Sequence, residues 1–154
     1  MEKKTDKIGF TLFRITSEQF AILEENFSEK GKISIQTSLR FGAEETQKLI
    51  GVYASFTFMS QQKPFIVIEA ACHFMIHPDA WMVMCPIENN YLTVPRGFLS
   101  HLAMLTIGTT RGILHAKLEG TRFNQFLIPT INVLEIIKED TVLSFKVTDK
   151  TIST

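Results

Sequence analysis

Two cysteines and two histidines lie close together in the sequence and could, by type, bind zinc. They are Cys72, His73, His77 and Cys85. Residues 65–76 have the alternation of a β-strand, and neighbouring side chains of a strand point to opposite faces, so Cys72 and His73 cannot readily share one ion. We therefore expect no metal site, with the thiols as core groups and the imidazoles on the surface.

The stretch that follows carries further titratable side chains. On a helix, His101 and His115 would be about 21 Å apart along the axis at 1.5 Å per residue, which is too far for an acid–base pair. Three cations of the same stretch could bind anionic groups: Arg96, Arg111 and Lys117. Cations on one helix are more often solvated or paired with carboxylates, and we favour that interpretation.

The sequence contains none of the common catalytic motifs. A Gly-x-Ser-x-Gly nucleophile elbow, a phosphate-binding loop, a dinucleotide fingerprint, His-Glu-x-x-His and Cys-x-x-Cys are all missing. These motifs carry the nucleophiles, phosphate cradles and metal ligands of large enzyme classes. We therefore expect a protein that is not an enzyme and that binds no cofactor.

The most clearly marked element is a long helix, predicted for about Pro95 to Leu118. Proline suits the first turn of a helix, and Gly120 stands where a left-handed residue would end it. At about 100° per residue, one face is expected to lie on a core. That face carries Phe98, Leu102, Leu105, Thr109, Gly112, Ile113 and Ala116.

Nearly opposite this face the helix has a second apolar side. It consists of Ala103, Ile107, Leu114 and Leu118. The apolar surface is therefore wider than the roughly 100° stripe of a helix on the surface of a monomer. We expect the second side to contact another helix, another segment or a second subunit of a homo-oligomer, a dimer or tetramer; the alternative is a helix buried within a single domain.

Apolar and polar residues alternate with a period of two before this helix, which predicts antiparallel strands. We expect strands at 8–26, with a bulge near Ser17, and at 31–41, 49–60 and 65–76. A polar crossover or helical turn is expected at 42–48 and a hairpin turn at 61–64. Residues 81–90 have no clear period. After the long helix, a short helix is expected at 133–139 and an extended segment at 141–147.

Length and composition indicate one domain. The chain has 154 residues and no linker-like stretch. Residues 1–7 are polar and are expected to form a disordered tail ahead of a single domain at 8–154. With sixteen basic and sixteen acidic residues the formal charge is zero, so no net field favours nucleic acid or an anionic membrane.

The expected compartment is the cytoplasm. No signal-peptide core follows the N-terminal residues, and no segment has the ~20 apolar residues that insertion across a membrane requires. The two cysteines have neither the number nor the spacing of a disulfide scaffold, and a reducing compartment would keep them as thiols.

Several of the thirteen phenylalanines fall outside the best-patterned core positions. These are Phe20, Phe27, Phe41, Phe123 and Phe126. One interpretation is that they cover the sheet edge as minor core clusters. The other is a client-binding groove, in which aromatic pockets take the side chains of an extended apolar polypeptide and the sheet edge pairs with its main chain.

The order of these features resembles the SecB family of bacterial export chaperones, from Ile8 to about Ile137. The resemblance rests on a set of strands followed by Pro95, the helix to Leu118, Gly120-Thr121, Leu127-Ile128-Pro129 and Asn132. It implies a four-stranded antiparallel sheet with helices on one face, dimers whose sheets continue across subunits, and pairing of dimers through the long helices. The function it implies is that of an ATP-independent holdase, which binds unfolded polypeptides in protein export.

Other functions remain open. The family engages the export motor through acidic surface, and the neutral charge of this chain argues against that partner. The family's C-terminal tail is usually helical, unlike the extended segment expected here. One alternative is a chaperone that guards an antitoxin, and another is an interaction or scaffold protein with the same fold. An acyl-thioester enzyme of the hot-dog type is less favoured, because its central helix precedes most of the strands.

Overall fold

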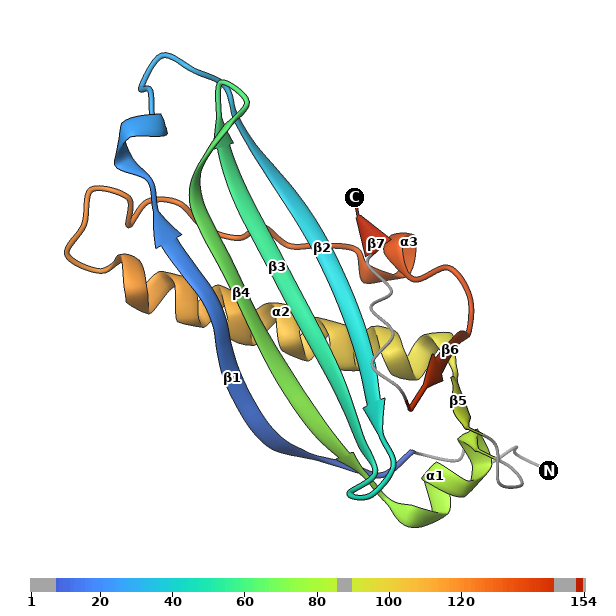
Figure 1. Cartoon of the computed structure of the whole chain (residues 1–154). Coiled ribbons are helices and arrows are strands. Elements are labelled where there is room, and N and C mark those ends of the chain that lie inside the picture. The colour runs from blue at the N-terminus through green and yellow to red at the C-terminus, as the bar shows by residue number, and fades with distance from the viewer. Residues whose placement is uncertain (1–7, 86–89, 146–151, 154) are drawn as a thin grey trace.

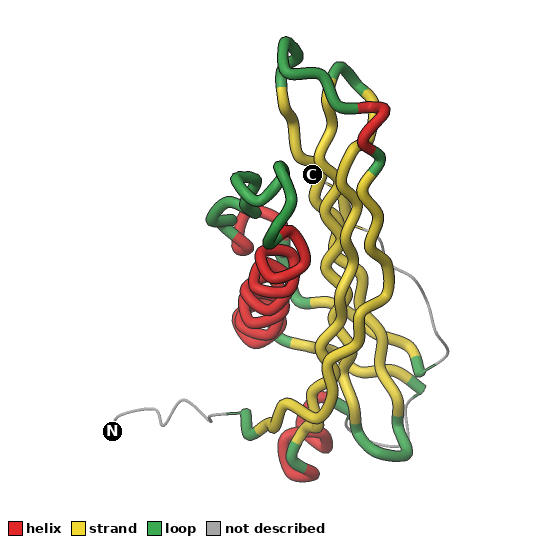
Figure 2. The backbone as a smooth tube through the Cα atoms, turned by 90° about the vertical axis from the view of Figure 1, so that its left-hand side faces the viewer, coloured by secondary structure: helices red, strands yellow, loops and turns green. Residues whose placement is uncertain are grey.

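A twisted antiparallel sheet carries one long helix across one of its faces (Figure 1 and Figure 2). This architecture comes from a computed structural model, which describes residues 8–85, 90–145 and 152–153. It confirms the expected α+β class with a four-stranded antiparallel sheet, β1-β4-β3-β2, and a long helix packed against it. The expected tail at residues 1–7 lies outside the described residues.

The elements follow one another in the chain as strands first and the long helix second. They are β1 (Phe10–Ile22), the 3-10 turn η1 (Glu24–Asn26), β2 (Ile33–Glu44), β3 (Leu49–Ser60), β4 (Lys63–Ile76), α1 (Pro78–Met84), β5 (Tyr91–Val94), α2 (Arg96–Leu118), α3 (Val133–Ile136), β6 (Thr141–Ser144) and β7 (Ile152–Ser153).

Strands β2, β3 and β4 form two successive hairpins. Ser60 pairs directly with Lys63, so the turn between β3 and β4 consists of two residues, Gln61 and Gln62, with φ angles of 50° and 65°. Positive φ at both positions is typical of the type I′ turn, whose twist matches that of the flanking strands. The expected strand boundaries here are close, although the turn is shorter than the predicted 61–64.

The expected crossover or helical turn at 42–48 is wrong. Strand β2 continues to Glu44, which pairs with Leu49 of β3, and a tight turn joins the two strands. The Glu44 carboxylate accepts hydrogen bonds of 2.8 Å from the backbone N–H of Thr46 and of Gln47. These bonds give the backbone N–H groups of the turn an acceptor. The polar side chain of Glu44 thus stabilises a tight hairpin turn at this position.

Strand β1 lies at the other edge of the sheet and pairs with β4. Its register shifts between Leu12 and Arg14 and again between Ser17 and Gln19, which confirms the bulge expected near Ser17. Bulges bend and twist an edge strand locally. The chain then passes from β1 to β2, on the far side of β3, through the connection at 23–32.

The side of α2 that was expected to contact a partner is instead the side that packs inside the same chain. Pro95 precedes it as predicted, and Gly120, with φ +76°, lies just beyond its end. The expected subunit interface is corrected, because all four of its residues are buried in the core of the chain itself: Ala103, Ile107, Leu114 and Leu118. Leu105, expected in the core, is 41% exposed. An apolar pattern on both sides cannot tell which side meets the sheet.

The segments around α2 form a smaller sheet and two short helices. Strand β5 pairs with β6, which confirms the extended segment predicted at 141–147 over its described part. The segment at 81–90, which has no clear period, begins within α1, whose Trp81 stacks on Phe145 at 5.8 Å between ring centroids. The expected short helix after residue 132 is α3.

Candidate binding groove between two loops

The turn after α2 directs the following loop back across the end of the sheet. Thr121 makes two short-range bonds: its Oγ1 donates to the carbonyl of Leu118 at 2.8 Å and accepts from the N–H of Phe123 at 3.1 Å. Gly120 supplies the left-handed residue that this reversal requires. Residues 121–128 therefore return as a defined loop.

The opposite wall is the connection between β1 and β2. The Leu23 N–H donates to the Phe65 carbonyl at 2.8 Å, and the Asn26 side-chain amide donates to the Pro64 carbonyl at 2.8 Å. The Ser28 N–H donates to the Ser60 hydroxyl at 3.0 Å. This connection is thus held against the β3–β4 hairpin rather than extending into solvent.

Five phenylalanines fill the space between the two loops and form the phenylalanine cluster. They are Phe27, Phe58, Phe65, Phe123 and Phe126. Neighbouring ring centroids in the cluster are 5.0 to 6.3 Å apart. Tilted and edge-on pairs at such distances stabilise one another beyond simple burial, by about 0.5–1.5 kcal/mol each.

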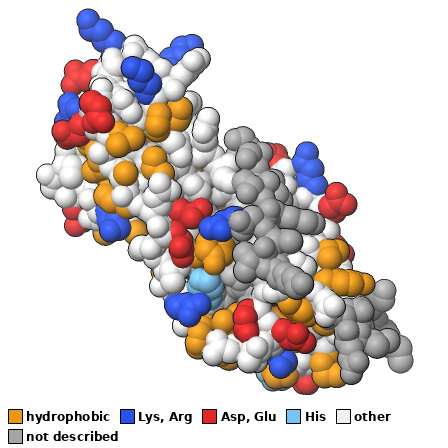
Figure 3. Space-filling model, in the orientation of Figure 1, with side chains coloured by type: hydrophobic (Ala, Val, Ile, Leu, Met, Phe, Trp, Pro, Cys, Tyr) orange, Lys and Arg blue, Asp and Glu red, His pale blue; other side chains and the backbone are white. Residues whose placement is uncertain are grey.

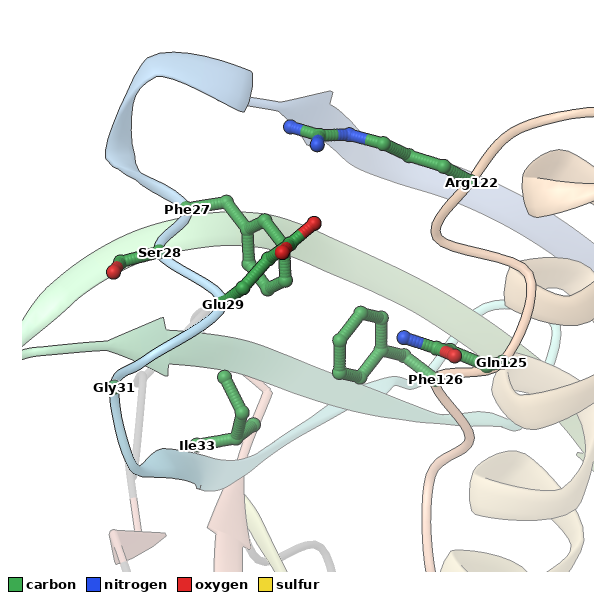
Figure 4. A pocket seen from close by; sticks show the side chains of 8 residues that line it. All are labelled: Phe27, Ser28, Glu29, Gly31, Ile33, Arg122, Gln125 and Phe126. Atoms are coloured by element: carbon green, nitrogen blue, oxygen red, sulfur yellow. The ribbon is translucent and has the colours of Figure 1, made fainter.

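An opening of about 330 Å³ lies over this cluster, and we call it the loop groove. Figure 4 shows Phe27 and Phe126 approaching from the two loops, with Ile33 below them. The lining of the loop groove comprises Phe27, Ser28, Glu29, Gly31, Ile33, Arg122, Gln125 and Phe126. The volume is near the lower end of ligand pockets, which run from about 300 to 1,000 Å³. It suits one or two apolar side chains.

The rim of the loop groove carries charges of both signs. The Arg122 guanidinium lies 4.9 Å from the Phe123 ring centroid and 5.2 Å from that of Phe27. Its Nε is also 4.0 Å from a carboxylate oxygen of Glu24. Glu29 lies on the same rim. Exposed pairs of this kind contribute little stability, so these groups can also contact a ligand.

The structure brings together three of the five phenylalanines predicted as client-binding residues. Phe27 and Phe126 line the loop groove, and Phe123 contacts both rings from a fully buried position. Phe41 is buried in the main core, and Phe20 lies on β1, where the Lys117 Nζ is 5.1 Å from its ring centroid.

Ile33, Arg122 and Gln125 line the loop groove although sequence reasoning did not single them out. Ile33 belongs to the alternating pattern of β2, and it is partly exposed at the start of the strand. Arg122 and Gln125 are surface residues by type. Only the packing of the two loops reveals their shared role.

The candidate metal ligands do not converge. Cys72 and His73 lie on opposite faces of β4, as expected, but His73 is buried rather than on the surface, because the side chains of Tyr53 and Thr16 on neighbouring strands pack against its ring. Among the described residues, no group of three or more His, Cys, Asp or Glu side chains could hold a metal ion. Neither Cys72 nor Cys85 forms a disulfide bond.

The arginines of α2 bind backbone carbonyls, which corrects the interpretation that they are solvated or paired with carboxylates. Arg111 donates to the carbonyls of Ile128 and Pro129, both at 2.7 Å. Arg96 donates to the Ile137 carbonyl at 2.6 Å and to the Leu134 carbonyl. Both guanidinium groups therefore fix the returning segment along the helix. Arg111 thereby holds the end of the loop at 121–128, and Arg96 holds the segment around α3.

The chain is an α+β protein with a groove over a phenylalanine cluster at one end of its sheet. No model of a protein family matches the sequence, and no curated protein matches it. Within the described part of the chain, no helix is long and apolar enough to cross a membrane. Function must therefore be argued from the residues and their arrangement.

Proposed function

We propose that the protein is a SecB-like holdase, an ATP-independent chaperone that binds unfolded polypeptide in the cytoplasm. The observation that carries this proposal is the loop groove, an open apolar surface over the phenylalanine cluster. Unfolded chains share exposed apolar side chains rather than a sequence. An aromatic groove without a deep, shaped cavity suits such clients.

The strand edge beside the loop groove offers main-chain pairing to a client. Among the described residues, β7 pairs with β2 only at Ser38 and Leu39. The outer edge of β2 at residues 33–36 therefore lies next to the groove without a strand partner in the described part of the chain. An extended client could add a strand there while its side chains enter the groove.

Holding would act by mass action. Binding to the unfolded state lowers the concentration of free unfolded chains, and aggregation slows accordingly. The mixed charges of Glu29 and Arg122 at the rim allow clients of either sign to approach. The formal charge of zero also gives no long-range preference for one class of client.

We also propose that the chain forms a homo-oligomer through a different surface from the one expected. Phe10 of β1 contacts Phe98 and His101 of α2, with ring centroids 5.7 and 5.8 Å apart. One step further along each element lies an exposed apolar area, which we call the lateral patch. It consists of Leu12, Ile15 and Leu105. In the described part of the chain, β1 pairs only with β4. The patch borders the other edge of β1, so a second subunit there could extend the sheet.

Light scattering of an aggregating client tests the holdase proposal. The variant Ile33→Ser/Leu127→Ser changes one residue of the groove lining and one exposed residue of the loop, which are 39% and 56% exposed. Because both lie at the surface, the fold should survive while suppression of aggregation weakens. Val83→Ser is the matched control, since Val83 is 80% exposed on α1, away from the groove.

Two results would contradict the proposal. One is a wild type that suppresses aggregation of none of several unfolded clients, which would leave an interaction or scaffold role. The other is a folded Ile33→Ser/Leu127→Ser variant that holds clients as well as Val83→Ser does. Circular dichroism and thermal unfolding of both variants show whether the comparison is between folded proteins.

A further inference from the structure

The face of the sheet turned away from α2 carries a second hollow, of about 270 Å³. Figure 3 views this face, where histidine, basic and acidic side chains gather near the middle. We call this hollow the outer hollow. Its lining includes Arg14, Arg40, Gly42, Gly51, Tyr53 and His73. It is distinct from the loop groove and shares no lining residue with it.

Strand register places these residues in two adjacent rows across the sheet. Gly42 pairs with Gly51, Gly51 with His73, and His73 with Arg14. In the next row on the same face, Arg40 pairs with Tyr53. Two glycines side by side therefore form a floor without side chains, and the larger groups stand around it.

Contacts within the protein explain why a glycine is needed at one of these two positions, but not at the other. A Cβ on Gly51 would lie 3.2 Å from His73 Nδ1 and 3.3 Å from the Tyr53 ring, so Gly51 lets these two rings approach. A Cβ on Gly42 would meet nothing within 4 Å among the described residues. Glycine weakens a strand interior and often marks close approach of a ligand. The described residues thus leave the space above Gly42 open to a ligand.

The walls of the outer hollow are held in place. Arg40 donates to Glu69 at 3.3 Å, and its guanidinium lies 4.2 Å from the Tyr53 ring centroid. The Tyr53 and His73 rings meet edge to face at 5.7 Å. Burial raises the pKa of the Tyr53 hydroxyl, so this group stays protonated at neutral pH and can donate a hydrogen bond.

Arg14 is the cation that the hollow leaves for a ligand. It lines the hollow, and no carboxylate lies within ion-pair distance of it among the described residues. At the opposite end, the Glu44 carboxylate already accepts two backbone N–H groups. An anionic group would therefore lie at the Arg14 end, where a guanidinium fork suits a carboxylate.

We propose that the outer hollow binds a small carboxylate with a flat body, the acid group on Arg14 and the flat body over Gly42 and Gly51. The glycine floor accepts a planar group at van der Waals distance, and the Tyr53 ring forms one wall. The site goes beyond the proposed holdase activity and does not depend on it, because the loop groove lies elsewhere on the molecule.

Nuclear magnetic resonance titration tests the site with benzoate, acetate and inorganic phosphate as separate probes. Benzoate should produce saturable shifts in the amides around Gly42, Gly51 and His73, with acetate and phosphate weaker. Gly42→Val should fill the floor and weaken benzoate binding at least roughly tenfold. Valine suits a strand, so this variant should keep the fold. If Gly42→Val does not fold, the smaller substitution Gly42→Ala is used in its place.

Two further variants separate the site from general attraction of anions. Arg14→Gln should also lose benzoate binding, while Gly108→Ala should not, since Gly108 lies on α2 and a Cβ there likewise meets nothing within 4 Å. No saturable shift with benzoate would overturn the proposal. So would undiminished benzoate binding in folded Gly42→Val, or phosphate binding as tightly as benzoate.

Discussion

A single imidazole, His73, links the outer face of the sheet to the acid stability of the protein. Burial lowers its pKa from the ordinary value of 6.5, and the nearby Arg14 charge lowers it further, while Glu18 opposes both effects. The charged and titratable groups around it on this face are Arg14, Glu18, Arg40, Tyr53 and Glu69. The folded protein therefore holds His73 neutral at pH 7.

We expect the free energy of unfolding to fall as pH is lowered from about 7.5 to about 5.5. The unfolded chain takes up the proton near pH 6.5 and the folded chain only at lower pH, so acid favours the unfolded state. Urea denaturation at several pH values measures this slope. His73→Gln should flatten it; an unchanged slope would contradict the assignment. Backbone hydrogen bonds lower the pKa of the Glu44 carboxyl below its ordinary value of 4.5. Its titration therefore affects the free energy of unfolding only at more acidic pH than that of His73.

Arg96 stabilises the protein through carbonyl groups rather than through carboxylates. Its side chain donates to the carbonyls of Leu134 and Ile137, which ties the start of α2 to the segment around α3. Hydrogen bonds from a charged group contribute about 1.5–3 kcal/mol, and partial exposure reduces this. Arg96→Met should therefore lower the free energy of unfolding by about 1–3 kcal/mol, measured by urea denaturation.

The exposed Lys138 provides the comparison for Arg96. Lys138→Met removes a charge of the same sign nearby and should change stability by less than about 0.5 kcal/mol. If both methionine variants unfold at the same urea concentration, the carbonyl contacts of Arg96 contribute nothing measurable to the fold.

At the scale of elements, the two sides of α2 should respond in opposite ways to the same charge. Leu105 is 41% exposed in the lateral patch, whereas Ile107 is 3% exposed in the core. Leu105→Glu should keep the fold and shift the sedimenting mass from oligomer to monomer. Ile107→Glu should unfold the chain, because a buried unpaired carboxylate is heavily penalised.

Sedimentation equilibrium and circular dichroism together check this pair. A wild type that sediments as a monomer at micromolar concentration would remove the lateral patch from consideration as an interface. A folded Ile107→Glu protein would contradict the placement of this side of α2 against the sheet.

The extent and ends of α2 could be predicted from the sequence, but its rotation could not. Pro95 and Gly120 are local signals, and both lie where the sequence places the ends. Leu105 and Ile107 are equally apolar, so periodicity could not tell which one faces the sheet. Strand alternation in β3 was predicted for the same local reason, whereas β5 was missed because its partner β6 is distant in sequence.

The candidate site was predictable only by residue type. Aromatic residues outside the patterned core pointed to Phe27 and Phe126, and equally to Phe41, which is buried. Two loops distant in sequence meet at the loop groove, and their meeting depends on the Thr121 turn and the Asn26 bond to Pro64. No local pattern encodes such an encounter.

At the scale of the whole molecule, three surfaces are spatially separate. The loop groove lies at one end of the sheet, the outer hollow on the face away from α2, and the lateral patch beside α2 and β1. An oligomer assembled through the lateral patch would leave the other two open. Several loop grooves in one assembly could then engage one long client together, which raises avidity without any new contact.

The place of β1 at the edge next to β4 has a consequence for synthesis on the ribosome. Phe10 pairs with Ile76, so the first strand to emerge has no partner until the end of β4 has been synthesised. At about 5–20 residues per second this delay is on the order of several seconds. The inner face of the sheet waits longer still, until Leu118 completes α2. The nascent chain thus passes through a state with the exposed apolar segments that a holdase would recognise.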